Sequence, residues 1–388
     1  MLESEEAARR LGVKVTTLYA YVSRGMLVSH PSADRRRSLF DVDDVEQLAQ
    51  RSRGAKRVES RLATVTTAIT QLRDDGPAYR GQPVASLALA APFEDVAELL
   101  WGTGPAPWEP VALGPVPELS VPDLFCWAVI MAGAREPLPS DQRLESVARS
   151  ARRFIATMIE TLPRRGATAP PLRTSDGTTR PGSVAGHLAA RLATDPSAAL
   201  VGAVNAALVL LADHELATST VAVRVAASTR GALSDALLAG LGTLAGPLHG
   251  GASQLAYAML SEAERHGVGR ALDDTLRWQR ILPGFGHTVY KRGDPRVAIL
   301  MECFEQLATP EQRRLVRSLI ELAADHDIPP PNVDLGLAAL TWSAQMLPES
   351  GRTIFAVART AGWTAHYLEE LGERPLRFRA RAVYASGG

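Results

Sequence analysis

Cysteine is almost absent from this sequence, which has only Cys126 and Cys303 in 388 residues. Two distant cysteines exclude a disulfide framework and leave no metal-ligand pattern, so we expect no metal. An excess of charge is also absent, because 42 Lys and Arg residues balance 42 Asp and Glu residues. No overall field therefore recruits nucleic acid or a membrane. The chain has neither a membrane-length apolar run nor a basic and apolar leader, so we expect a cytoplasmic protein.

Most of the sequence is predicted to be helical. Apolar residues recur at helical spacing over residues 93–101, 197–214 and 221–244, whereas alternating strand patterns are nearly absent. Residues 105–122 and 164–181 are rich in proline or polar side chains and indicate long connections. We therefore expect an all-α body.

The first 57 residues form a separate segment. Short helices are expected from Ser4, ending at Gly12, and over residues 18–22, ending at Gly25, followed by a hairpin and a helix over 41–48. Two short helices joined by a glycine-containing turn are typical of a helix-turn-helix. A polar linker over residues 51–57 then leads into the body.

This segment resembles the winged helix-turn-helix domains of MerR and excisionase type, through Ala-Ala-Arg-Arg-Leu-Gly-Val at 7–13 and Arg-Gly-Met-Leu at 24–27. The resemblance implies that the second helix enters the major groove of DNA and that the wing contacts phosphates. The residues expected to contact DNA are Thr17, Tyr19, Arg24, Arg35, Arg36 and Arg37. The alternative is a docking or oligomerisation module whose arginines lie in a solvated turn.

The chemistry of the body is concentrated around a glycine-rich bend, Gly284-Phe285-Gly286, that precedes His287. Glycines bring the backbone close to a ligand, and His287 could donate a hydrogen bond to a developing oxyanion. Lys291 and Arg296 follow, and an arginine can hold a carboxylate by two parallel bonds. The alternative is a surface loop with a solvated histidine.

A second glycine-flanked histidine, His249, precedes a helix expected from Gln254 to about Arg265. The positive end of the helix dipole opposes protonation there, so a neutral imidazole that donates a hydrogen bond is expected. The alternative is an incidental histidine in a tightly packed glycine-rich segment.

Three further residues are candidates. Asp334 follows Pro-Pro-Pro-Asn-Val and is either the cap of the next helix or a fixed base that removes a carbon-bound proton. His214 ends an apolar helix and is either a substrate ligand or a core histidine. Arg359 lies within an apolar helix, where its charge requires an anion.

Taken together in order, these motifs resemble the citrate synthase family. They are Asp-His-Glu-Leu at 213–216, Gly-Pro-Leu-His-Gly-Gly at 246–251, Gly-Phe-Gly-His at 284–287 with Asp-Pro-Arg at 294–296, Asn-Val-Asp at 332–334, and residues 355–366. The resemblance implies a two-domain helical fold and a homodimer. The large domain would comprise residues 58–234 and 344–388, and the small domain residues 235–343.

The resemblance also implies the reaction, which joins acetyl-CoA or propionyl-CoA to oxaloacetate and needs no cofactor beyond these substrates. His249, His287 and Asp334 would be catalytic. His214, Arg296 and Arg359 would bind oxaloacetate, and Arg379 would complete the site of the partner subunit. Lys291 and the bend 284–286 would bind CoA.

The sequence departs from the family pattern at Thr288, where arginine is usual, at Ala217, at Leu-Gly-Leu 335–337 and at Ala380. These changes leave the acyl-CoA open, because pocket walls decide between acetyl and propionyl groups. Two other functions also stay open. One is a DNA-binding regulator whose body senses oxaloacetate or CoA, and the other is a helix-turn-helix segment that only tethers subunits.

Overall fold

The computed structural model of the chain describes residues 1–11, 13–23, 27–31, 38–42, 44–45, 48, 65–73, 75–173, 179–180, 182–246, 249–279 and 282–379. The chain divides into two compact units. The first comprises Met1–Thr66 with Phe378–Gly388, and the second comprises Thr67–Arg377. The predicted linker over residues 51–57 lies outside the described residues.

The first unit contains two short helices and a small sheet. Helix α1 spans Ser4–Leu11 and helix α2 spans Val15–Ser23. Strands β1 (Leu2–Glu3), β3 (Ser38–Phe40) and β2 (Ser29–Pro31) are antiparallel in that order. The helices pack on the sheet through a hydrophobic core, which consists of Ala7, Ala8, Leu11, Leu18, Leu27, Phe40 and Val45.

The third helix of this unit is only partly visible, at residues 42, 44, 45 and 48. Of the residues expected to contact DNA, Thr17 and Tyr19 lie on α2. Tyr19 is 44% exposed, and its hydroxyl lies 3.0 Å from that of Ser4. The other four, Arg24 and the wing arginines at 35–37, lie outside the described residues.

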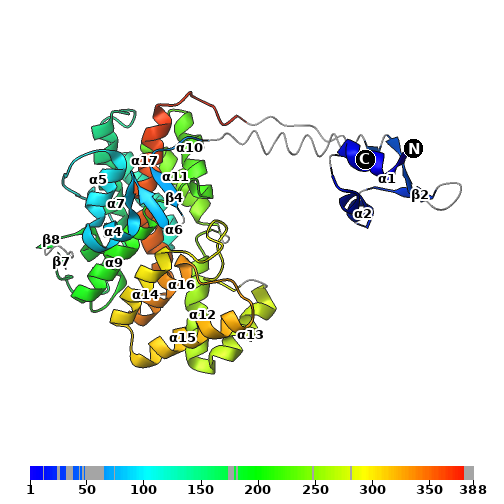
Figure 1. The fold of residues 1–388 in the computed structure, drawn as a ribbon. Helices are drawn as coiled ribbons and strands as arrows, with labels where there is room; N and C mark the ends of the chain where they lie inside the picture. Colours follow the sequence, from blue (N-terminus) through cyan, green and yellow to red (C-terminus); the bar gives the residue numbers. More distant parts are fainter. Residues whose placement is uncertain are drawn as a thin grey trace. The chain divides into compact units, whose positions relative to one another are not determined.

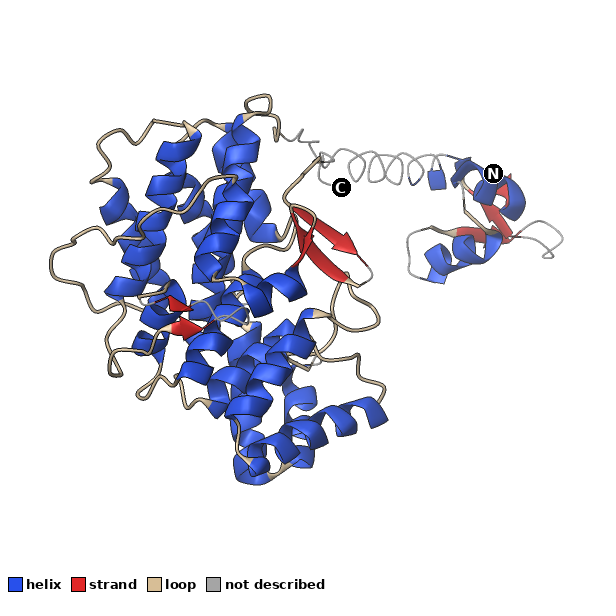
Figure 2. Cartoon of the chain, turned by 60° about the vertical axis from the view of Figure 1, so that its left-hand side comes forward, coloured by secondary structure: helices blue, strands red, loops and turns tan. Residues whose placement is uncertain are grey.

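The second unit is mostly helical, as predicted, and Figure 1 and Figure 2 show its helices packed side by side. Its helices are α4 (Val84–Ala90), α5 (Phe93–Trp101), α6 (Val121–Gly133), α7 (Leu144–Thr161), α8 (Val184–Leu192), α9 (Ala198–Leu211), α10 (Thr218–Ser228), α11 (Leu233–Leu244), α12 (Ala252–His266), α13 (Val268–Gln279), α14 (Arg296–Leu307), α15 (Pro310–Asp325), α16 (Val333–Ser343) and α17 (Ser350–Leu371). Among the described residues no helix is both long and apolar enough to cross a membrane.

Two sequence predictions about this unit need correction. The apolar stretch 221–244 is not continuous, because α10 ends at Ser228 and Arg230 adopts a φ of 64° before α11 begins. The sequence also showed no convincing strands, yet β4 (Thr70–Arg73), β5 (Gly76–Tyr79) and β6 (Gln82–Pro83) form an antiparallel sheet.

These strands are too short to show an alternating pattern. A second hairpin, formed by β7 (Leu172–Arg173) and β8 (Thr179–Arg180), interrupts the long connection expected over 164–181. Residues 103–120, by contrast, contain no helix or strand, as the prolines predicted.

The main core is built around α9 and α17. Nearly every residue of α9 is buried, and α17 is buried almost all round, including Trp363 and Tyr367. A helix that is apolar on all sides lies in the centre of a protein rather than on its surface. Glycine is needed at 362 because a Cβ there would lie 2.3 Å from the carbonyl oxygen of Ala212.

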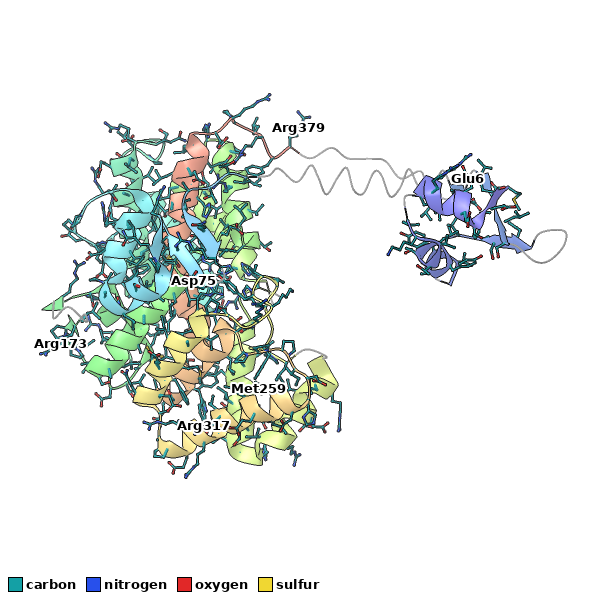
Figure 3. The ribbon with its side chains drawn as sticks, in the orientation of Figure 1. Glu6, Asp75, Arg173, Met259, Arg317 and Arg379 are labelled. Atoms are coloured by element: carbon teal, nitrogen blue, oxygen red, sulfur yellow. The ribbon has the colours of Figure 1, made fainter. Side chains whose placement is uncertain are left out.

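A second core lies among α12, α13, α14, α15 and α16. It runs from Ala256 to Trp342 and includes Met259, which Figure 3 labels, whereas Arg317 on α15 has a 66% exposed side chain. Helix α11 packs in the main core. The division into a large domain of 58–234 with 344–388 and a small domain of 235–343 remains a prediction. The second core lies within residues 256–342, but residues of the predicted small domain also pack in the main core, namely Ile299, Leu300, Val333, Leu337 and Leu340.

Candidate active site

The glycine-rich bend at 284–286 is locked to the segment that precedes α16. The Gly286 N–H donates to the Pro330 carbonyl, and the Asn332 N–H donates to the Gly284 carbonyl, both at 2.8 Å. Gly284 has a φ of 83°, and a Cβ there would lie 2.8 Å from that of Leu335. Only glycine fits this close approach without strain. The two predicted motifs around His287 and Asp334 are therefore parts of one structure.

The backbone after His287 fixes the tautomer of its ring. The N–H groups of Val289 and Tyr290 donate to His287 Nδ1 at 3.0 Å and 3.1 Å. An atom that accepts hydrogen bonds carries no proton, so the neutral ring has its proton on Nε2. Burial lowers the pKa of His287, although Asp294 opposes this shift. His287 is therefore a neutral Nε2–H donor.

His214 faces the same space. Its ring centroid lies 5.3 Å from that of His287 and 5.5 Å from that of Tyr290. Its Nε2 atom is buried without a hydrogen-bond partner, and so is the Tyr290 hydroxyl. Burial lowers the pKa of His214, and the nearby Arg296 and Arg359 lower it further. Two unpartnered polar atoms beside two histidines mark a place for a polar ligand.

Arg296 is the first residue of α14 and is only 4% exposed. Asp294 grips it through two bonds, from Nε at 2.9 Å and from one terminal nitrogen at 2.8 Å. Asp294 also accepts from the Val333 N–H at 3.2 Å. This pairing fixes the guanidinium and leaves its other terminal nitrogen without a partner among the described residues. The cation is thus oriented, as a carboxylate ligand requires.

Arg359 supplies the second buried cation. It is 1% exposed, and its Nε donates to the Leu211 carbonyl at 2.9 Å. The guanidinium lies 4.6 Å from the centroid of the Phe355 ring. Burial lowers the pKa of Arg359, whereas Asp213 opposes that shift. No carboxylate of a described residue forms an ion pair with it, so the anion that the sequence requires for Arg359 is absent from its first contacts.

His249 lies just before α12, as predicted, and Gly251 is the N-cap of that helix. Its Nε2 lies 2.8 Å from the hydroxyl of the buried Ser219, and its ring centroid lies 6.3 Å from that of Phe355. Burial lowers the pKa of His249, and Arg359 adds to the effect. If the Ser219 hydroxyl donates to Nε2, the proton of the neutral ring is on Nδ1.

Asp334 is not the cap of α16. That cap is Asn332, whose side-chain oxygen accepts from the Asp334 N–H at 2.9 Å while its amide donates to the Gly286 carbonyl at 2.7 Å. Burial raises the pKa of Asp334 to about 6, although Arg296 opposes the shift. A fixed carboxylate with a raised pKa suits a general base near neutral pH.

The raised pKa of Asp334 makes Asp334→Asn stabilising at alkaline pH. Between the ordinary pKa of 3.8 and about 6 the folded protein binds more protons than the unfolded chain, so stability falls as pH rises through this window. We expect the variant to have a higher melting temperature than the wild type at pH 8, with the difference vanishing near pH 4. Scanning calorimetry measures both. A variant less stable than the wild type at pH 8 would contradict the proposed burial of charge.

The loop after His287 also borders a cavity of about 340 Å³. Its walls carry three cations, Arg73, Lys291 and Arg292, together with Tyr290. The ammonium group of Lys291 contacts the His287 carbonyl at 3.4 Å. A basic cavity next to His287 fits a substrate with phosphate groups at one end.

Two groups of predicted residues belong to the first compact unit. Arg379 belongs to the first compact unit and is exposed near the end of the described chain, where Figure 3 labels it. The helix-turn-helix residues also belong to that unit. The other predicted residues all lie in the second unit, and the contacts above connect most of them.

Sequence reasoning missed Ser219, Tyr290 and Asp294 as parts of the site. Ser219 lies five residues after His214, and Tyr290 lies three residues after His287. Asp294 was quoted only as part of the Asp-Pro-Arg motif. A position three to five residues after a candidate histidine was the available signal, but hydroxyl groups are too common in sequences for such a spacing to be decisive.

Comparison with known proteins gives consistent matches. The sequence model of "Citrate synthase, C-terminal domain" matches residues 115–381. Citrate synthase 2 of Bacillus subtilis (strain 168) is 37% identical over 49% of this chain and 52% of that protein. The chain therefore spans about half the length of this relative. Citrate synthase of Mycolicibacterium smegmatis is 30% identical over 83% of this chain and 94% of that protein.

Solved structures agree on the fold. The crystal structure of citrate synthase from Thermotoga maritima MSB8 is 25% identical, with a TM-score of 0.65, and covers 84% of this chain and 94% of that one. The structure from Thermoplasma acidophilum, a ternary complex with carboxymethyl coenzyme A and oxaloacetate, has a TM-score of 0.67 at 24% identity, over 84% of this chain and 95% of that one.

Proposed function

Because the chain belongs to the citrate synthase family, we propose that it condenses an acyl-CoA with oxaloacetate to release CoA. With acetyl-CoA the product is citrate, and with propionyl-CoA it is 2-methylcitrate. The observation that carries this proposal is the grouping of two neutral histidines, two buried arginines and Asp334 around unpartnered polar atoms. A dianionic keto acid satisfies both cations and leaves its ketone for a histidine donor.

Enolisation of the acyl group is the first step. Asp334 removes a proton from the carbon next to the thioester carbonyl, and the electrons move onto the thioester oxygen. His249 donates its Nδ1–H to that oxygen, because Ser219 occupies Nε2. An acid and a base on opposite sides of one acyl group lower the barrier to an enol-like nucleophile.

Carbon-carbon bond formation is the second step. His287 donates its Nε2–H to the ketone oxygen of oxaloacetate, where negative charge develops. Arg296, Arg359 and His214 hold the carboxylates and the ketone in place. The nucleophilic carbon then attacks the ketone carbon. Water finally adds to the thioester carbonyl and CoA leaves as the thiol, so one acyl-CoA, one oxaloacetate and one water give one tricarboxylate and one CoA.

CoA binding involves the basic cavity and closure of the small domain. Lys291 contacts a phosphate of CoA, and the bend 284–286 lies beside the pantetheine arm. Closure of the domain over residues 235–343 onto bound oxaloacetate completes the acyl-CoA pocket and limits wasteful hydrolysis. In a homodimer, Arg379 of the partner subunit supplies a further cation.

The departures from the family pattern leave the acyl group undecided. The described departures lie in different surroundings in the structure. Ala217 is the N-cap of α10 and forms no side-chain cap, so its change affects a helix end. Leu335 and Leu337 are buried in the cores. Thr288 is exposed beside His287 and is the remaining described departure. Ala380 lies outside the described residues.

Thiol release measures the acyl preference directly. Purified protein is mixed with oxaloacetate and either acetyl-CoA or propionyl-CoA, and free thiol is followed with a chromogenic disulfide. Release that requires oxaloacetate supports the proposal, and the ratio of kcat/KM values identifies the substrate. Absence of release with both substrates would favour a body that only senses these metabolites.

For the first unit we infer a winged helix-turn-helix that binds DNA. The support is the arrangement of α1 and α2 on a three-stranded sheet, with Thr17 and the exposed Tyr19 on α2. A tethering module remains the alternative.

Retention of Asp334, which binding alone does not need, argues against a body that only senses metabolites.

Salt dependence separates DNA binding from tethering. We expect the full chain to bind duplex DNA, with affinity falling as salt rises because arginines displace counterions from phosphates. Replacing Arg35, Arg36 and Arg37 by alanine should lower the slope of log K against log salt by about 2 to 3. Fluorescence anisotropy measures the slope. Unchanged DNA binding by the triple variant would exclude phosphate contacts by the wing. No DNA binding by the wild type at low salt would favour a tethering module.

A further inference from the structure

The turn between α9 and α10, which carries His214, is held by one face of α17. The Arg359 Nε donates to the Leu211 carbonyl at 2.9 Å, and the Gly362 N–H donates to the Ala212 carbonyl at 3.1 Å. His366 Nε2 lies 3.3 Å from an Asp213 carboxylate oxygen. Arginine, glycine and histidine at 359, 362 and 366 share a helix face by their spacing of three and four. Each contacts one residue of the turn.

Asp213 is the centre of this arrangement. Its carboxylate is completely buried and accepts from the Thr70 hydroxyl at 2.5 Å and the Glu215 N–H at 3.2 Å. Its backbone is held too, since its N–H donates to the Tyr79 hydroxyl at 3.0 Å. Glu215 adopts a φ of 54°, an uncommon backbone conformation that the bond to Asp213 supports. The backbone on both sides of His214 is therefore fixed.

The tautomer of His366 follows from its other neighbour. Its Nδ1 lies 2.7 Å from a terminal nitrogen of Arg224, and a guanidinium can only donate. Nδ1 is therefore the acceptor, so the ring is neutral and its proton is on Nε2, directed at Asp213. Arg224 is itself held by Glu369 at 2.6 Å and by Glu370 at 2.9 Å.

The negative charge of Asp213 acts on Arg359. Because His366 is a neutral donor, it orients the Asp213 carboxylate without cancelling its charge. Asp213 then offsets part of the charge of the buried Arg359, with which it interacts electrostatically. The guanidinium of Arg359 is therefore buried in the site without a substrate, and His214 Nε2 has no hydrogen-bond partner there.

We propose that His366, acting through Asp213, is a positioning residue that presets His214 and Arg359 for the carboxylates of the keto acid. This inference rests on the proposed function. The His366 ring need not touch the substrate. Its contribution is to orient the Asp213 carboxylate at the centre of this turn, and a small displacement of substrate-binding groups weakens binding strongly.

The test compares two substitutions of His366 in the full-length protein. His366→Leu removes both ring nitrogens, whereas His366→Gln keeps a donor for Asp213 and an acceptor for Arg224. We expect His366→Leu to raise KM and Kd for oxaloacetate about tenfold or more, since a buried carboxylate loses one of its hydrogen-bond donors. KM for the acyl-CoA should change by less than about twofold, and His366→Gln should restore most of the loss.

Controls keep a structural effect apart from positioning. Thr70→Val removes another donor to Asp213, on β4, and should also raise KM and Kd for oxaloacetate. It replaces His366→Leu as the test if that variant does not fold. Thr364→Val removes a buried hydroxyl of α17 whose one hydrogen bond among the described residues is to the Thr360 carbonyl, and it should leave both KM values unchanged. A fall in melting temperature without a change in oxaloacetate KM or Kd in His366→Leu and Thr70→Val would overturn the inference.

Turnover by the wild type separates the proposed function from the positioning role of His366. If the wild type releases no CoA, the proposed function fails, while calorimetric binding of oxaloacetate still tests the positioning of His214 and Arg359. If the wild type is active and both variants bind oxaloacetate normally, the inference alone fails.

Discussion

Asp334→Ala is expected to lower kcat by about 10²- to 10⁴-fold, the usual contribution of a general base. The substitution removes the only group assigned to take the proton from the acyl carbon. Oxaloacetate should still bind, because Arg296, Arg359 and His214 are unchanged and one negative charge is lost from the neighbourhood. Steady-state thiol release and calorimetry with oxaloacetate measure the two effects separately.

Asp325→Ala is the matched control, because Asp325 is an exposed aspartate at the end of α15. It should behave as the wild type. In the wild type, the rate should fall as pH decreases through about 6, since the base must be ionised and its pKa lies there. Near-normal turnover by Asp334→Ala would refute the mechanism, and an acid limb near pH 4 would contradict the raised pKa.

Replacing His287 or His249 by alanine should lower kcat by about 10²- to 10³-fold each, the effect of losing one hydrogen-bond donor to a developing oxyanion. The contacts of the two rings make a sharper prediction. His287 donates from Nε2, a position that the amide of glutamine approximates. With the Ser219 hydroxyl donating to Nε2, His249 donates from Nδ1, which asparagine approximates better. We therefore expect His287→Gln to exceed His287→Asn in kcat, and His249→Asn to exceed His249→Gln.

The exposed His326 provides the control, because His326→Ala should leave kcat unchanged. All four amide variants are compared at saturating substrate, so that kcat reports the chemical step. Equal activity of the asparagine and glutamine variants at both positions would contradict the assigned tautomers. The reverse order at His287 would mean that Nδ1, not Nε2, faces the ketone.

The sequence was sufficient to identify the family and most of the candidate residues. Five motifs in a fixed order are specific, because independent coincidences at five places are improbable. The helical body was also predictable, since α9 and α17 show apolar residues at helical spacing over many turns. Short features escaped, such as β4 and β5 with four residues each.

The electrostatic details of the site depend on contacts between distant residues and could not be predicted. Asp213 and His366 are 153 positions apart, and nothing in either local pattern predicts their contact. The role of Asp334 was also open, because an aspartate before an apolar helix can cap it. The structure resolves this by placing the Asn332 oxygen on the Asp334 N–H. The direction of each histidine proton likewise required the neighbouring donors.

Identification of the product tests the central claim most directly. The protein is incubated with oxaloacetate and acetyl-CoA labelled with ¹³C at the methyl carbon, and the products are separated by mass spectrometry. The proposed function predicts citrate carrying the label and an equal amount of free CoA, both dependent on oxaloacetate. If propionyl-CoA is preferred, labelled 2-methylcitrate should appear instead. Free CoA with labelled acetate and no tricarboxylate, or no CoA from either substrate, would contradict a condensing enzyme.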